Sequence, residues 1–102
     1  MELKIGNVRL ENPYILAPMA GVTDLPFRLL CKEMGAGLIC MEMVSAKAIS
    51  FHNKNTEKLM EIEEKERPVS MQLFGSDPDL IAEMAAQIEE RPFDILDLNM
   101  GC

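Results

Sequence analysis

Short apolar runs alternate along the chain with longer amphipathic segments. The runs cover residues 14–17, 38–43, 69–74 and 94–98, and their starts lie about 25 to 30 residues apart. Each run has the length of a buried strand, whereas the segments between them have the spacing of apolar positions typical of helices. Strands that alternate with helices in this way predict parallel strands joined by right-handed crossovers.

The first ten residues predict a separate hairpin. Leu3–Ile5 and Val8–Leu10 are strand-length segments, and the turn-forming pair Gly6-Asn7 lies between them. A short β-hairpin therefore precedes the four parallel strands.

The first helix has clear signals at both ends. Thr23 and Asp24 are both good capping residues, and Pro26 follows in what becomes the opening turn. Gly35 is the expected stop.

The segments on either side of the third run differ in clarity. Residues 76–90 predict a regular helix, with Asp77 as its cap and Pro78 at its first position. Residues 45–67 are less periodic and predict a loop followed by a helix around residues 56–62.

Four strand and helix units fit either half of a (β/α)8 barrel or most of an open doubly wound sheet. A GxGxxG motif after the first strand, the signature of dinucleotide-binding sheets, is absent. We therefore predict an α/β fold: the N-terminal half of a (β/α)8 TIM barrel, with four parallel strands preceded by a short β-hairpin. Residues 1–102 form one partial domain.

Composition and charge limit the classes of function. The chain has 102 residues and a net charge of −7, which disfavours binding of nucleic acid by this stretch through electrostatics. No apolar run is long enough for a membrane span, and the first twelve residues lack the apolar core of a signal peptide, so we expect a cytoplasmic protein without membrane contact. Three scattered cysteines and one histidine predict no metal site.

Side-chain alternation divides each strand into an apolar side and a side that becomes polar near the carboxyl end. In a barrel these polar sides meet at the rim where active sites are built. Met43 is predicted on the apolar side. The polar side is predicted to carry Cys40, Glu42, Ser70, Gln72, Asp97 and Asn99.

Structural roles stay open for several of these residues. Gln72 can satisfy neighbouring backbone groups, and Asn99 can belong to a turn. Glu42 and Asp97 are also typical of interior charges held by hydrogen bonds, and Cys40 is typical of a buried apolar position.

Cys102 differs from the other cysteines because it follows a glycine at the rim end of the fourth strand. A thiol of ordinary pKa is mostly protonated at neutral pH and can serve as a general acid. A lowered pKa would make it a nucleophile instead, but the sequence offers no paired histidine nearby.

Four segments occur in an order that is known from one enzyme family. They are LAPMAGVTDLPFR, GAGLICMEMVSAKAI, PVSMQLFGSDPD and DILDLNMGC. At these segments the chain resembles the tRNA-dihydrouridine synthases, particularly their bacterial B-type branch. APMAG alone also resembles other flavin barrels such as the old yellow enzyme relatives, whereas the combination of segments is specific.

The resemblance implies a cofactor, a substrate and roles for particular residues. It implies an FMN enzyme that reduces the 5,6 double bond of uridine in tRNA, with NADPH as the electron donor. Pro18, Met19 and Ala20 match the turn against the flavin ring, and Gln72 matches a glutamine at the flavin's polar edge. By the same resemblance, Asn99 lies near the flavin and the target base. Cys102 matches the catalytic proton donor of the family.

The resemblance also implies that residues 1–102 are an N-terminal fragment. The family pattern continues beyond the glycine and cysteine, and the later strands, the FMN phosphate site and a helical tRNA-binding domain have no counterpart in the chain. We therefore expect the chain alone to be inactive, poorly soluble and weak in FMN binding. Two alternatives are an FMN ene-reductase of the old yellow enzyme type and a non-catalytic product with a binding or assembly role.

Overall fold

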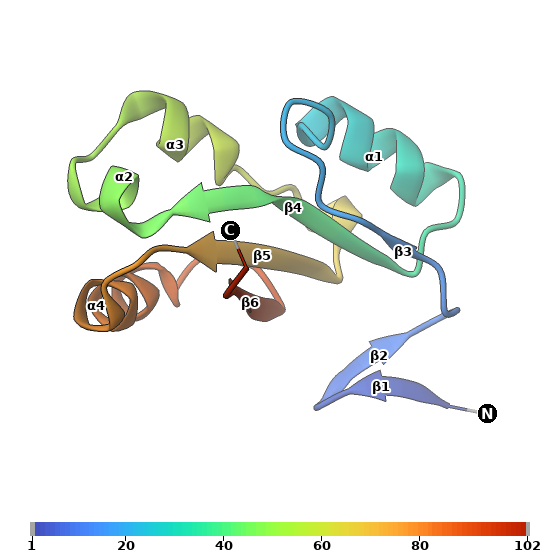
Figure 1. The fold of residues 1–102 in the computed structure, drawn as a ribbon. Coiled ribbons are helices and arrows are strands. Elements are labelled where there is room, and N and C mark those ends of the chain that lie inside the picture. Colours follow the sequence, from blue (N-terminus) through green and yellow to red (C-terminus); the bar gives the residue numbers. More distant parts are fainter. Residues whose placement is uncertain (1, 102) are drawn as a thin grey trace.

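The computed structural model describes residues 2–101, which form an open sheet with helices along it and a separate hairpin (Figure 1). No helix among these residues is both long enough and apolar enough to cross a membrane. The elements in chain order are β1 (Leu3–Ile5), β2 (Val8–Leu10), β3 (Ile15–Leu16), α1 (Leu25–Glu33), β4 (Leu38–Ser45), α2 (Ala46–Ser50), α3 (Lys54–Leu59), the 3-10 helix η1 (Glu64–Glu66), β5 (Val69–Phe74), α4 (Pro78–Ile88) and β6 (Ile95–Asn99).

The sheet confirms the predicted fold class. Its four strands run parallel in the order β3-β4-β5-β6, and β1 and β2 form an antiparallel pair outside it. This is the arrangement of the N-terminal half of a (β/α)8 barrel. Among the described residues β3 and β6 each have one unpaired edge, so the sheet does not close.

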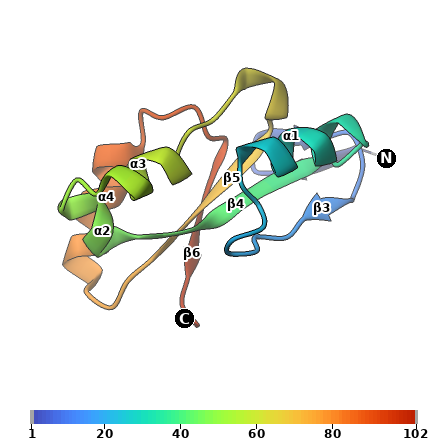
Figure 2. The same cartoon turned by 90° about the horizontal axis from the view of Figure 1, so that it is seen from above.

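One side of the sheet is covered by helices and holds the apolar core. Both α1 and α3 contact β4, and Figure 2 shows them following one another along that strand. The core residues from the strands and helices are Ile39, Met41, Val44, Ala46, Ile49, Met60, Val69, Met71, Leu73, Met84 and Ile88. The opposite side of the sheet, called the inner side below, carries the polar residues of β5 and β6.

Local signals place both ends of α1. The Asp24 carboxylate accepts a hydrogen bond from the Phe27 N–H at 3.0 Å, which makes Asp24 the cap rather than Thr23. The helix ends at Glu33, and Gly35 follows with φ of 108°, a conformation that favours glycine. The predicted stop is therefore confirmed.

The α4 helix also agrees with its prediction. Asp77 accepts hydrogen bonds from the N–H groups of Asp79 and Leu80, and Pro78 occupies the first helical position. A proline fits there because its missing N–H has no partner within the helix.

The segment between β4 and β5 differs from its prediction. It contains two short α-helices and the 3-10 helix η1 where one helix was predicted around residues 56–62, and Ser45 caps α2 and Asn53 caps α3. Helices of five and six residues are too short to give a periodic signal. Strand bounds differ less: β5 is as predicted, while β3 is shorter and β4 is longer than its apolar run.

Candidate functional site

A bulge in β4 changes which residues reach the inner side of the sheet. The pairing passes from Cys40 opposite Ser70 to Met43 opposite Gln72, so β4 uses one residue more than β5 over this interval. Met43 therefore lies on the inner side, and its predicted place on the apolar side is wrong. Simple alternation fails here because the extra residue shifts the register by one.

The bulge also directs Glu42 towards the loop after β3. Its carboxylate accepts a hydrogen bond from the Gly21 N–H at 2.5 Å. Gly21 has φ of 76°, a conformation that most side chains disfavour. Glu42 thus holds the loop against β4 and does not join the polar residues of β5 and β6.

Three polar residues at the carboxyl ends of β5 and β6 form a hydrogen-bonded set, called the inner cluster below. Gln72 Nε2 donates to Asp97 Oδ2 at 2.8 Å, and Asn99 Nδ2 donates to Gln72 Oε1 at 3.2 Å. Asn99 Oδ1 accepts from the Gly101 N–H at 2.9 Å. The structure therefore confirms that Gln72, Asp97 and Asn99 share one face, and it joins them to the backbone that leads into Cys102.

The loop after β3 is a compact turn. Met19 O accepts hydrogen bonds from the Val22 and Thr23 N–H groups, both at 2.9 Å. The buried Thr23 hydroxyl donates to Met19 O and accepts from the Met19 N–H, each at 3.1 Å. The turn is thereby fixed from within while Pro18, Met19 and Ala20 stay exposed.

A buried ion pair supports this turn from the helix side. Arg28 is 2% exposed and donates through Nε to Glu66 Oε1 at 2.8 Å, and Glu66 is fully buried. The same guanidinium donates to the carbonyls of Thr23 and Glu61 at 3.0 and 2.8 Å. Such a fork of donors suits arginine rather than lysine. Arg28 was not singled out from the sequence, because nothing local indicates that a helix residue meets Glu66.

Cys40 lies on the inner side of the sheet, beside the inner cluster. Burial raises the pKa of its thiol, the negative charge of Asp97 raises that pKa further, and a hydrogen bond with Ser70 partly opposes both effects. The thiol is therefore protonated at neutral pH. Sequence reasoning gave Cys40 no role because its strand neighbours become evident only from the register.

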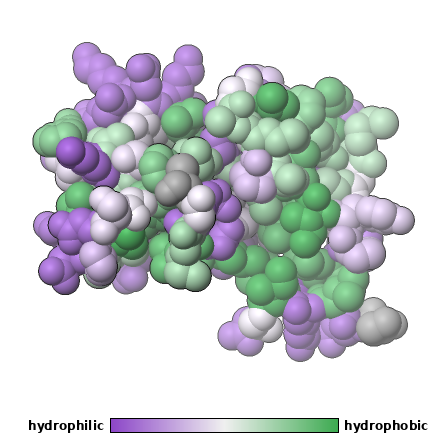
Figure 3. Space-filling view, in the orientation of Figure 1, coloured by the Kyte–Doolittle hydropathy of each residue, from purple (hydrophilic) through white to green (hydrophobic). Residues whose placement is uncertain are grey.

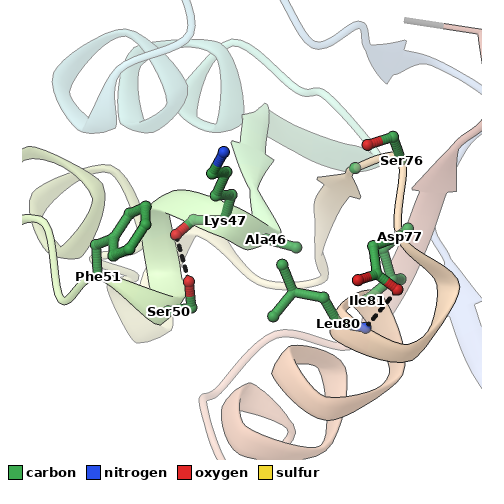
Figure 4. A pocket seen from close by; sticks show the side chains of 9 residues that line it. Ala46, Lys47, Ser50, Phe51, Ser76, Asp77, Leu80 and Ile81 are labelled. Carbon is green, nitrogen blue, oxygen red and sulfur yellow. Dashed lines mark hydrogen bonds between the residues drawn. The ribbon is translucent and has the colours of Figure 1, made fainter.

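A cavity of about 290 Å³ opens between α2 and the loop that leads into α4 (Figure 4). Ala46, Leu80 and Ile81 supply apolar lining, and the Ser50 hydroxyl donates to the Lys47 carbonyl at 2.6 Å. None of the residues that the sequence singled out for a site lines this cavity, so it is separate from the inner cluster.

The structure brings together part of the predicted site. Gln72 and Asn99 are in direct contact, whereas Pro18, Met19 and Ala20 lie in the loop after β3, which β4 separates from β5. Among the bonds of residues 2–101, it is the contact of Gly21 with Glu42 that ties this turn to β4. The predicted proton donor, Cys102, lies outside the described residues.

The inner cluster has the chemistry to hold a flat group with alternating donors and acceptors. A side-chain amide offers two N–H bonds and two lone pairs, and within the cluster Gln72 uses one of each. One N–H and one lone pair remain, which fits the polar edge of an isoalloxazine ring. Across residues 2–101 there is no group of three acidic, cysteine or histidine side chains that could hold a metal ion.

Comparison with known proteins gives one consistent family. Residues 15–102 match the family described as Dihydrouridine synthase (Dus). The chain is 41% identical over 100 residues to tRNA-dihydrouridine synthase B of Pseudomonas aeruginosa and 45% identical over 100 residues to that of Vibrio parahaemolyticus. It is 42% identical over 101 residues to a probable tRNA-dihydrouridine synthase of Rickettsia bellii.

These matches cover the chain and the relatives very unequally. Each spans 98% of this chain, but the chain spans only 30% or 31% of the length of these curated relatives.

Proposed function

Because this chain belongs to the dihydrouridine synthase family, we propose that the complete protein reduces the 5,6 double bond of uridine in tRNA to give dihydrouridine. The observation that carries the proposal is the contact of Gln72 with Asn99 beside the Gly101 backbone. It groups polar side chains at the carboxyl ends of parallel strands, where barrel enzymes build their sites.

The proposal includes bound FMN, with NADPH as the electron donor. Bound FMN, once reduced by NADPH, would supply a hydride for carbon 6 of the uracil ring. The exposed turn of Pro18, Met19 and Ala20 offers a rigid surface for close approach of the flavin ring. The N–H and lone pair of Gln72 that the inner cluster does not use would orient the polar edge of that ring. The hydrogen bonds of the inner cluster support the assignment of Gln72, and the exposure of Pro18, Met19 and Ala20 supports that of the turn.

The remaining roles concern the target base. We assign Asn99 to contact the base, and its hydrogen bond to Gln72 supports this role. The thiol of Cys102 would give its proton to carbon 5. Hydride and proton together saturate the double bond. The uridine must leave its stack in the tRNA to reach this position.

The test is complementation of a bacterial strain whose tRNA lacks dihydrouridine with the complete protein that carries residues 1–102. Dihydrouridine is measured by mass spectrometry of digested tRNA. The wild-type protein restores it, and Cys102→Ala lowers the rate of its formation by about 100-fold or more, as expected for loss of a general acid. The matched control is Cys31→Ala on α1, which leaves the rate within a factor of about two.

Two outcomes contradict the proposal. The first is a wild-type protein that is expressed and folded but forms no dihydrouridine. The second is a purified protein that reduces small enones equally well with and without Cys102 and does not act on tRNA, a result that favours an ene-reductase.

A further inference from the structure

The inner cluster has two fixed ends with two reversible amides between them. A carboxylate such as that of Asp97 only accepts hydrogen bonds, and the backbone N–H of Gly101 only donates. The side-chain amides of Gln72 and Asn99 each carry a donor group and an acceptor, so each has two orientations of nearly equal shape. The ends therefore decide how the amides point.

Both ends require the same orientation. The Gly101 N–H donates a hydrogen bond to Asn99 Oδ1, and the amide Nδ2 of Asn99 then faces Gln72 Oε1. Gln72 Nε2 is then turned towards the Asp97 carboxylate, which accepts it at 2.8 Å. Hydrogen bonds thus run in one direction from Gly101 to Asp97.

Asp97 differs from Asp94, the carboxylate residue just before β6. Asp94 is paired with the Arg67 guanidinium, whereas no ion pair among residues 2–101 includes Asp97. The partner that the structure gives Asp97 is the amide of Gln72, directly opposite it in the β5–β6 register. A charge-assisted hydrogen bond of this kind is stronger than one between neutral groups.

We infer that Asp97 is a positioning residue that fixes the amide orientation of Gln72 and, through Asn99, the Gly101 backbone that leads into Cys102. The inference rests on the function proposed above and deepens it. With this orientation the unspent N–H of Gln72 belongs to the Asp97 side of the amide and the unspent lone pair to the Asn99 side. A ring whose donors and acceptors follow a fixed order is then accepted in one orientation only.

The first experiment measures the FMN affinity of the complete protein after the flavin has been removed, by titration with FMN and the quenching of its fluorescence. Asp97→Ala raises the dissociation constant about tenfold, the scale of one charge-assisted hydrogen bond. Asp97→Asn, which keeps a neutral acceptor, raises it less. Asp79→Asn, an exposed carboxylate on α4, is the matched control and leaves it unchanged.

A double-mutant cycle separates positioning from a general effect on the fold. In a Gln72→Ala background, Asp97→Ala changes the FMN dissociation constant by a factor of less than about two, because the amide that Asp97 orients is gone. An equal effect of Asp97→Ala with and without the Gln72 side chain overturns the inference.

The second experiment needs no flavin. The exchange of the Gln72 Nε2 protons with solvent is followed by NMR in flavin-free protein with ¹⁵N-labelled glutamine, and the exposed Gln87 on α4 serves as the internal reference. The protons of Gln72 exchange more slowly than those of Gln87, and Asp97→Ala removes the difference. Equal rates in the wild-type protein contradict the inference.

The two failures are distinguishable. A protein that binds no FMN and forms no dihydrouridine contradicts the proposed function, while the exchange rates still report on Asp97. Normal catalysis together with exchange that does not respond to Asp97→Ala contradicts the inference alone.

Discussion

Thr23 connects the buried side of the fold to the exposed turn of the candidate site. Its hydroxyl bonds both the N–H and the carbonyl of Met19, and its own carbonyl accepts from the Arg28 guanidinium. Thr23 therefore links the turn, through its hydroxyl, to the ion pair of Arg28 with Glu66, through its backbone carbonyl. From the sequence Thr23 was a candidate helix cap, and only the structure shows that Asp24 takes that role.

The hydroxyl of Thr23 is what we expect to hold the turn. Thr23→Val keeps the shape of the side chain but leaves the Met19 N–H without its acceptor, at a cost of about 1–3 kcal/mol in the free energy of unfolding. Hydrogen exchange of the Met19 amide in the complete protein should then be faster.

The matched control for this change is Thr23→Ser. It loses a methyl group but keeps the hydroxyl, so the protection of the Met19 amide should persist even if the protein is somewhat less stable. Equal loss of protection in the two variants would show that the methyl group, not the hydrogen bonds, holds the turn.

At the scale of elements, Asp94 joins the start of β6 to the start of β5. It accepts hydrogen bonds from the Arg67 guanidinium and from the Val69 N–H, the latter at 2.8 Å. Burial by itself raises the pKa of Asp94, but these hydrogen bonds and the charge of Arg67 outweigh it and leave the pKa below its usual value. The ionised form is therefore the one that stabilises the fold.

This direction sets the pH dependence. A carboxylate whose pKa is lowered by folding contributes stability above its unfolded pKa and loses it as pH falls towards the folded value. We expect Asp94→Asn to lower the free energy of unfolding by about 1–3 kcal/mol at pH 7. The difference from the wild-type protein should shrink below the usual pKa of 3.8.

Urea unfolding of the complete protein at several pH values measures this difference. Asp79→Asn is the control, because the exposed Asp79 side chain makes no such clamp between strands. A gap between Asp94→Asn and wild type that stays constant, or grows, as the pH falls contradicts the assignment.

At the scale of the whole molecule, apolar surface remains exposed at both edges of the sheet. Figure 3 shows apolar surface extending over the side of α1 and β3 towards the hairpin. Tyr14 and Met34 are 73% and 81% exposed there, and Leu98 is 51% exposed at the β6 edge. Unpaired strand edges beside such side chains are templates for association.

We therefore expect residues 1–102, produced alone, to associate as their concentration rises. Sedimentation velocity over a range of concentrations measures this. Leu98→Lys should reduce association because a charge at an edge strand opposes pairing. Lys65→Glu, in η1 and outside both edge strands, should not. A chain that sediments as a monomer at every concentration contradicts the prediction.

The sequence by itself determined the alternation of strands with helical segments, the hairpin, the bounds of β5, the stop of α1 and the cap of α4. These features depend on neighbouring residues: side-chain periodicity, turn-forming pairs and capping side chains such as Asp77. It also determined that Gln72, Asp97 and Asn99 share a face, because β5 and β6 are regular strands.

Only the tertiary structure decided the features that depend on strand register or on contacts between distant segments. The bulge in β4 moved Met43 to the inner side and turned Glu42 towards Gly21, and no local signal marks that extra residue. The partners of Arg28 and Asp97 lie 38 and 25 residues away along the chain. Such contacts arise when separate elements pack, and so they follow from the folded chain rather than from any single segment of it.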